Sequence, residues 1–293
     1  MVPLNPLEDT EFFRMTRFRD GFAGKVESPE VWQRFAEKFA RWRRLDRPPR
    51  ASVPRIVHQI WIGGAMPERN RAIASSWRSL NPGFEYRLWE EAAILGLGNF
   101  EARGAYHRAR SVGAKSDIAR YEILRRFGGL YVDTDFECLK PFAELTDSCE
   151  LILGNLYNEK PELPNGLIGV RPGHWLMSLL CARTAKARAV IKPMAVLEAT
   201  GPYLLTRSVI ENFPSLGDYD VVFPSDYFYP LHNYQRHLAP SEAKAKYVTD
   251  RTYAIHYWDV SWSRISLRAR LVRRARRAIR HIVSACTESQ RRN

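Results

Sequence analysis

Two carboxylates separated by one residue, Asp133 and Asp135, are the side chains whose types and spacing most directly suggest chemistry. Alternate side chains of an extended segment point to the same side, so both carboxylates can reach one ligand. Carboxylate oxygens suit hard divalent cations such as Mg²⁺ and Mn²⁺, which keep coordination positions open for phosphate oxygens and water. The pair therefore predicts a metal site that could neutralise the charge of a departing diphosphate.

The residues before the acid pair predict a helix followed by a buried strand. Ser116 is a helix-capping residue type, and apolar residues recur at helical spacing as far as Phe127. Gly128 and Gly129 then end the helix. Residues 130–132 are apolar, too few for a helix and rich in strand formers, so we expect a strand. Ligands of open α/β sheets bind beyond the carboxyl ends of strands, which is where this order puts the two aspartates.

Longer segments of the chain resemble glycosyltransferase family 32. The matching stretches, in family order, are IVHQIWIGG (56–64), NPGFEYRLW (81–89), SDIARYEILRRFGGLYVDTDFECLKP (116–141), NGLIGVRPGH (165–174), TGP (200–202) and AIHYWDVSW (254–262). The family contains yeast-type α-mannosyltransferases and bacterial capsule and polysaccharide glycosyltransferases, and the clostridial glucosylating toxins resemble it more distantly. The resemblance implies an α/β fold of the GT-A-like kind, a single nucleotide-sugar-binding domain with a mixed central sheet.

The resemblance also implies roles for single side chains on a nucleotide-sugar donor. Asp117 and Arg120, which helical spacing puts on one face, would contact the sugar hydroxyls and the diphosphate side. Arginine suits this task because its charge is permanent and its planar head forks onto oxygens. Tyr131 would lie against the ribose, Asp133 near the ribose and donor sugar, and Asp135 directly on the metal. A surface salt bridge is the alternative interpretation of Asp117 and Arg120.

The first predicted core strand, residues 55–62, carries two further donor-site candidates. Trp61 lies where the toxins stack an aromatic ring on the nucleotide base, a contact worth about 1–3 kcal/mol per base in nucleic-acid systems. His58 is the second candidate. The alternatives are a core tryptophan at the end of a strand and a buried histidine whose nitrogens are satisfied inside the protein.

A second group of candidates lies near the end of the matching region. In related enzymes a C-terminal segment returns to the active site and completes the metal coordination. By this resemblance His256 and Ser261 would join Asp133 and Asp135 as metal ligands, and Trp262 would cap the donor pocket. The implied cofactor is Mn²⁺ or Mg²⁺, and a histidine ligand suits Mn²⁺. The toxins use different residue types here, so a purely structural His256 is the alternative.

Composition and pattern divide the chain into three parts. Residues 1–50 predict a helical N-terminal extension and linker, residues 51–262 the GT-A-like domain, and residues 263–293 a basic amphipathic helix or tail. The last part holds ten arginines and one glutamate, hence nine of the thirteen net positive charges. A helix running from Arg264 to Arg280 can lie on an anionic membrane surface. A helix packed on the domain or a disordered tail is the alternative.

The chain has no apolar run of membrane-spanning length and no signal-peptide pattern at its start. We therefore expect a cytoplasmic protein, bacterial in origin, that is free or peripheral on the inner face of the cytoplasmic membrane. The four cysteines have no metal-binding or CxxC spacing, and reduced, mostly buried thiols are expected. They are Cys138, Cys149, Cys181 and Cys286.

The expected function is a metal-dependent, retaining glycosyltransferase. It would move a hexose of mannose, galactose, glucose or N-acetylglucosamine type from GDP-mannose or a UDP-hexose to a saccharide or lipid-linked saccharide, in capsule, exopolysaccharide or lipopolysaccharide synthesis. One alternative is a haloacid-dehalogenase-type phosphatase, but that motif wants Thr or Val where Glu137 stands. The other is a nucleic-acid-binding protein. It rests on the net charge of +13 without a binding motif, so we expect no specific nucleic-acid partner.

Overall fold

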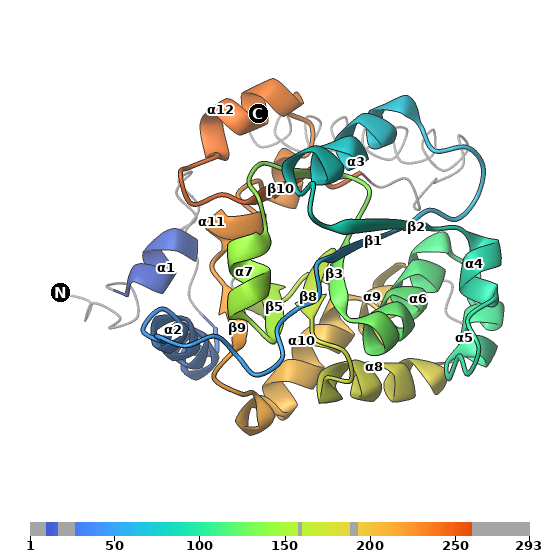
Figure 1. Cartoon of the computed structure of the whole chain (residues 1–293), viewed down its shortest axis with the longest axis horizontal. Coiled ribbons are helices and arrows are strands. Elements are labelled where there is room, and N and C mark those ends of the chain that lie inside the picture. The colour runs from blue at the N-terminus through green and yellow to red at the C-terminus, as the bar shows by residue number, and fades with distance from the viewer. Residues whose placement is uncertain (1–9, 17–26, 158–159, 188–192, 260–293) are drawn as a thin grey trace, which may run out of the picture. The chain divides into compact units, whose positions relative to one another are not determined.

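A six-stranded mixed sheet forms the centre of the computed structural model, which describes residues 10–16, 27–157, 160–187 and 193–259. The strand order is β2-β1-β3-β8-β5-β9 (Figure 1). β1 is parallel to β2 and β3, β8 is antiparallel to β3 and β5, and β5 is parallel to β9. The strands are β1 Ile56–Ile60, β2 Glu85–Trp89, β3 Gly129–Val132, β5 Leu151–Gly154, β8 Leu167–Val170 and β9 Asp220–Phe223. The predicted fold class, α/β with a mixed central sheet, is confirmed.

Three interior strands of the sheet and the edge strand β9 are buried along their whole length. Every residue of β3, β5, β8 and β9 is buried, which is typical of strands with packed elements on both sides. α6 (Val112–Phe127) packs against α8 (Trp175–Ala185), and α8 in turn against α10 (Pro202–Glu211). These helices lie together beside the sheet in Figure 1. β3, which runs into the acid pair, is therefore a buried interior strand.

α6 begins earlier than predicted. Ser111, not Ser116, is the capping residue, and its Oγ accepts a hydrogen bond from the backbone N–H of Ala114 at 3.1 Å. The prediction was wrong because both serines suit a cap and the sequence pattern does not show which hydroxyl finds a free N–H. Asp117 consequently lies inside the helix and not in its first turn.

A small second sheet joins two distant parts of the chain. β4 (Phe136–Cys138) follows the acid pair directly and pairs antiparallel with β10 (Ala254–His256). In this register His256 lies opposite Phe136. The two-stranded sheet therefore brings the end of the described region next to the aspartates.

The N-terminal helices are part of the domain core. One face of α2 (Pro29–Trp42) is apolar and buried, and the Phe39 ring lies 5.9 Å from the Phe223 ring of β9. α1 (Glu11–Thr16) packs against α2. The other described elements are α3 Glu68–Leu80, α4 Glu91–Leu95, α5 Arg103–Arg108, α7 Ala143–Ser148, β6 Leu156–Tyr157, β7 Pro161–Glu162, α9 Pro193–Ala199, η1 Phe213–Ser215, α11 Ser225–Phe228, η2 Asn233–Gln235 and α12 Pro240–Tyr247.

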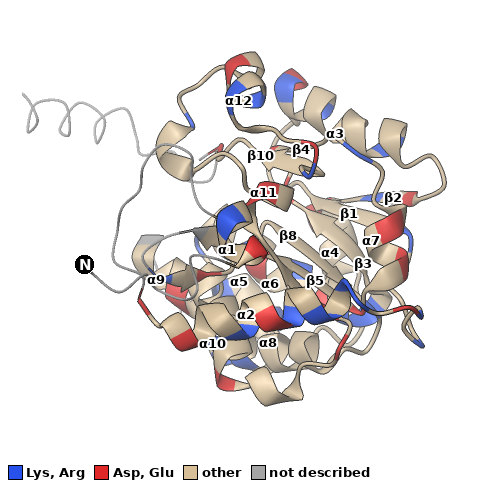
Figure 2. Cartoon of the chain, turned by 90° about the vertical axis from the view of Figure 1, so that its left-hand side faces the viewer, with Lys and Arg blue, Asp and Glu red and all other residues tan. Residues whose placement is uncertain are grey.

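Charge is mixed over the described elements. Figure 2 shows basic and acidic residues interspersed, for example on α2 and α12. The arginine-rich stretch from Arg264 to Arg280 and Cys286 lie outside the described residues. Cys138, Cys149 and Cys181 are buried free thiols, as predicted. Within the described ranges, no helix combines the length and apolarity that a membrane crossing requires.

Candidate active site

Two glycines position the strand that carries the site. Gly128 has φ 59° and Gly129 has φ 92°, in the region that favours glycine. A Cβ on Gly129 would lie 2.8 Å from the carbonyl oxygen of Ile56 in β1. The chain can therefore turn sharply from α6 into β3 and still pair closely with β1.

Asp133 leaves the end of β3 and is held from several sides. Its Oδ1 accepts a hydrogen bond from the Tyr131 hydroxyl at 2.7 Å and lies 3.4 Å from Nη2 of Arg120. Its N–H donates to the carbonyl oxygen of Gly166 at 2.8 Å. A Cβ on Gly166 would come within 2.8 Å of Asp133 Oδ2, so only glycine leaves room for this carboxylate.

Asp117 and Arg120 form a buried ion pair at 3.1 Å, so the surface salt-bridge alternative is wrong. The Arg120 guanidinium also lies 4.4 Å from the ring centre of Tyr131. Burial alone would lower the pKa of Arg120, but Asp133, Tyr131 and Asp117 together raise it. Burial raises the pKa of Asp117 against the opposing effect of Arg120. A permanent positive charge is thus held beside Asp133.

Asn165 and Thr200 complete this group. Nδ2 of Asn165 donates to Asp117 Oδ1 at 2.8 Å and to the Tyr121 hydroxyl at 3.2 Å, and the Asn165 carbonyl accepts from Arg120. The Thr200 hydroxyl donates to Asp117 Oδ2 at 3.0 Å. Neither Thr200 nor Asn165 is among the site residues predicted from the sequence. Their positions inside two of the family-like segments were the available signal.

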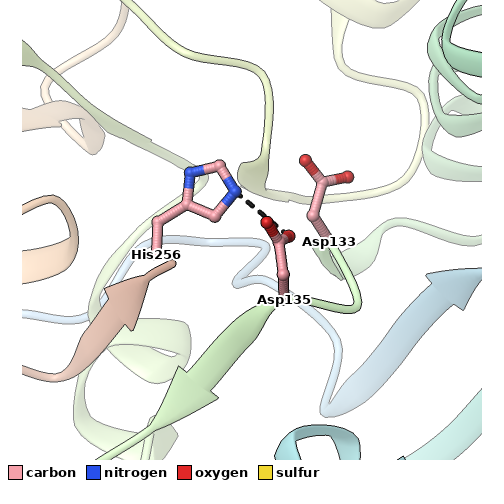
Figure 3. A group of neighbouring side chains, drawn as sticks. All are labelled: Asp133, Asp135 and His256. Atoms are coloured by element: carbon pink, nitrogen blue, oxygen red, sulfur yellow. Dashed lines mark hydrogen bonds and ion pairs between the residues drawn. The ribbon is translucent and has the colours of Figure 1, made fainter. Parts of the chain in front are cut away.

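Asp135 and His256 lie together across the β4–β10 pair (Figure 3). Nε2 of His256 is 3.1 Å from Asp135 Oδ1, and the imidazole stacks on Phe136 at 4.5 Å between ring centres. The backbone N–H of Asp259 donates to Asp135 Oδ2 at 2.6 Å. Figure 3 shows the imidazole and the Asp133 and Asp135 carboxylates gathered around one space.

These three side chains fit a divalent cation. One ligand atom from each of Asp133, Asp135 and His256 lies within 4.8 Å of the other two. Burial raises the pKa of Asp133 more than Arg120 lowers it, so Arg120 only partly compensates the negative charge of the Asp133 carboxylate. Burial also raises the pKa of Asp135, but His256 and the Asp259 N–H bring it below its usual value. Two carboxylates and an imidazole are a donor set that suits Mn²⁺.

His256 has a raised pKa and one unused nitrogen. Burial lowers its pKa, but the carboxylates of Asp135, Asp133 and Asp259 together raise it by more. Its Nδ1 is buried and has no hydrogen-bond partner among the described residues, so the ring is held by stacking and by Nε2. A cation on the Nε2 side would leave this packing in place.

Trp61 and His58, two other predicted donor-site residues, form their side-chain hydrogen bonds outside the group of Asp133, Asp135 and His256. Trp61 is half-buried, and its Nε1 donates to the carbonyl of Gly64 at 2.7 Å. His58 is fully buried, with Nδ1 accepting from Trp89 at 3.0 Å and Nε2 2.9 Å from the Gly128 carbonyl. Burial lowers its pKa to about 4. Both nitrogens of His58 are used inside the protein, so we give it a structural role. Ser261 and Trp262 lie outside the described residues.

One family model and several known proteins match parts of this chain. Residues 67–152 match the family described as the glycosyltransferase sugar-binding region containing DXD motif. An uncharacterized glycosyltransferase of Acanthamoeba polyphaga mimivirus is 27% identical over 69% of this chain and 83% of its own length. Inositol phosphoceramide mannosyltransferase 1 of Schizosaccharomyces pombe is 33% identical over 34% of each chain. This chain thus spans most of the viral relative but about a third of the yeast one.

Among solved structures, the catalytic domain of α-toxin from Clostridium novyi gives a TM-score of 0.47 at 9% identity. The match covers 76% of this chain and 81% of the toxin domain. In the family match, residues 67–152 include α3, α6, β3 and both aspartates of the acid pair. Residues 67–152, which hold the acid pair, are therefore similar to the glycosyltransferase sugar-binding region containing DXD motif.

Proposed function

We propose that this protein transfers a hexose from a nucleoside diphosphate sugar to a hydroxyl of a saccharide or lipid-linked saccharide, and that the transfer depends on a divalent metal. The observation that carries the proposal is the convergence of Asp133, Asp135 and His256 within 4.8 Å, beside the buried Arg120. Separate sequence segments supply these groups, and together they match the needs of a leaving diphosphate.

In this proposal Asp133, Asp135 and His256 hold Mn²⁺ or Mg²⁺, with Ser261 as a further ligand. The bound cation would neutralise negative charge on the diphosphate oxygens as the bond to the sugar breaks. Arg120, fixed by two carboxylates, supplies a permanent charge on the sugar and diphosphate side. Tyr131 would lie against the ribose, and Trp61 and Trp262 would cover the base and the pocket.

The hydrogen bonds of the site favour positioning over covalent catalysis. Both oxygens of Asp117 accept hydrogen bonds, from Asn165 and Thr200, and Asp133 accepts one from Tyr131. A carboxylate that is held in this way orients sugar hydroxyls better than it attacks carbon. We therefore propose retention of configuration through attack on the face that the diphosphate leaves, with the diphosphate assisting proton removal from the acceptor.

Two donor classes are proposed, and the names of relatives rank them. A named relative is a mannosyltransferase, which makes GDP-mannose the first donor to test and the UDP-hexoses the second. That relative's name also includes a ceramide lipid, which supports a lipid-linked acceptor at a membrane surface. We further propose that the enzyme works in the cytoplasm or on the inner face of the cytoplasmic membrane, in capsule, exopolysaccharide or lipopolysaccharide synthesis. Arginines between Arg264 and Arg280 would hold it there.

The test is a panel of nucleotide sugars assayed for nucleotide release with Mn²⁺. We expect release from one donor class, abolished by EDTA and reduced at least about 100-fold in Asp135→Asn. Asp147→Asn is the matched control, because Asp147 is an exposed acid on α7 that pairs with Arg55. Cleavage of p-nitrophenyl phosphate, with no donor bound or turned over, would contradict the proposal in favour of a phosphatase.

A further inference from the structure

A backbone N–H holds one of the two carboxylate oxygens of Asp135, the proposed direct metal ligand. Oδ1 faces His256, whereas Oδ2 accepts the N–H of Asp259 at 2.6 Å. The N–H of Tyr257 donates to the Asp135 carbonyl at 3.0 Å. The direction of the carboxylate therefore depends on where residues 257–259 lie.

That segment includes a backbone conformation that needs support. Trp258 has φ 57°, which is uncommon for a residue other than glycine. Its indole Nε1 donates to the Leu231 carbonyl at 2.7 Å, and its ring lies 4.2 Å from the His256 ring. These contacts fix the chain before the Asp259 N–H but do not fix Asp259 itself.

Arg69, from the first turn of α3, holds Asp259 from the other side. Its Nη1 lies 2.7 and 2.8 Å from the two carboxylate oxygens of Asp259. The guanidinium also lies 5.7 Å from the ring centre of Tyr257. The next residue, Asn70, donates to the carbonyl of Thr134, between the two aspartates, at 3.4 Å. The start of α3 thus contacts both the acid pair and the segment that orients it.

We propose that Arg69 is a positioning residue of the metal site, which holds Asp259 so that its N–H keeps Asp135 turned toward His256 and the cation. The proposal rests on the function proposed above. Without Arg69, Asp259 can move away, Oδ2 loses its donor and the Asp135 carboxylate gains freedom to rotate. Outer groups that orient a metal ligand commonly change metal affinity 10–100-fold.

The test compares Arg69→Gln with Arg71→Gln by calorimetric titration with Mn²⁺. Arg71 is a matched control, since it lies on the same helix, is similarly exposed and pairs with Glu68 instead. We expect about a tenfold weaker Mn²⁺ affinity for Arg69→Gln and no change for Arg71→Gln. Nucleotide release by Arg69→Gln should recover when Mn²⁺ is raised, and Arg69→Lys should keep part of the affinity. Thermal midpoints of the two glutamine variants in EDTA should agree.

Equal Mn²⁺ affinities for Arg69→Gln and wild type would overturn the positioning role. If Arg69→Gln does not fold, Asp259→Asn answers the same question, because it keeps the N–H and removes the charge that Arg69 holds. An Asp259→Asn variant with wild-type affinity would overturn the inference equally. If wild type binds Mn²⁺ no better than Asp135→Asn, the proposed metal site itself fails, which is a separate result from failure at Arg69.

Discussion

Arg120 is the side chain around which the polar residues of the site are arranged. It contacts Asp117 and Asp133 and lies over the ring of Tyr131. Helical spacing was enough to predict that Asp117 and Arg120 share a face. It could not show that Asn165 would bind both, because that contact depends on where the segment before β8 lies next to α6.

Replacing Asn165 tests whether this network positions the donor. Asn165→Ala removes the buried amide that donates to Asp117 Oδ1 and to the Tyr121 hydroxyl, so we expect about 1–3 kcal/mol of lost stability in urea unfolding. The KM for the donor should rise about tenfold, since this equals about 1.4 kcal/mol of binding. Asn212→Ala, which removes a single bond at the end of α10, is the control. An unchanged KM would show that Asn165 supports folding alone.

His58 predicts a pH dependence of stability that is independent of the metal site. Its folded-state pKa of about 4 lies below the ordinary 6.5, because burial disfavours the charged ring. Between these values the unfolded chain binds a proton that the folded chain does not, so stability falls as pH falls from 6.5 toward 4. The full loss is about 3 kcal/mol.

The measurement is urea unfolding of wild type and His58→Gln between pH 7.5 and 4. The variant should lose less stability than wild type on acidification, whatever its stability at pH 7.5. His232, whose pKa burial also lowers to about 4, contributes to the loss of stability on acidification in both proteins. Identical slopes would mean that His58 is not neutral and buried in solution.

At the scale of elements, the order of helix, glycine pair and strand was predictable because its signals are local. The α6–β3 junction needs positive φ and close backbone contact, and glycine, which stands at 128 and 129, is the residue type that meets both requirements. The pairing of β4 with β10 has no local signal, since about 120 residues separate Asp135 from His256. Only the family resemblance pointed to His256, and the structure shows the physical means, a two-stranded sheet.

Gly129→Ala tests the junction. Its φ of 92° and the 2.8 Å approach of a Cβ to Ile56 predict both strain and displacement of β1, and we expect a loss of about 2–4 kcal/mol. Gly173→Ala is the control, with φ 67° but no atom within 4 Å of the added Cβ. Strain alone should cost it about 1–2 kcal/mol. Equal losses in urea unfolding would show that contact with β1 does not matter.

At the scale of the molecule, one sheet and one strand pair bring residues from distant parts of the chain to a common site. Asp133 directly follows β3, Arg120 lies in α6, and His256 lies in β10. The family resemblance implied the α/β class, and the apolar strand and the helix before the acid pair were local features of the sequence that agreed with it. They could not predict how the N-terminal helices join the core through Phe39 and Phe223, which is a long-range contact.

The most direct test of the account is anomalous diffraction from crystals grown with Mn²⁺ and the diphosphate of the active donor. We expect one manganese peak coordinated by carboxylate oxygens of Asp133 and Asp135 and by Nε2 of His256, with manganese–oxygen distances of roughly 2.1 Å. The same soak of Asp135→Asn crystals should show no such peak. Manganese bound elsewhere, or equally strong in Asp135→Asn, would contradict the assignment of this site.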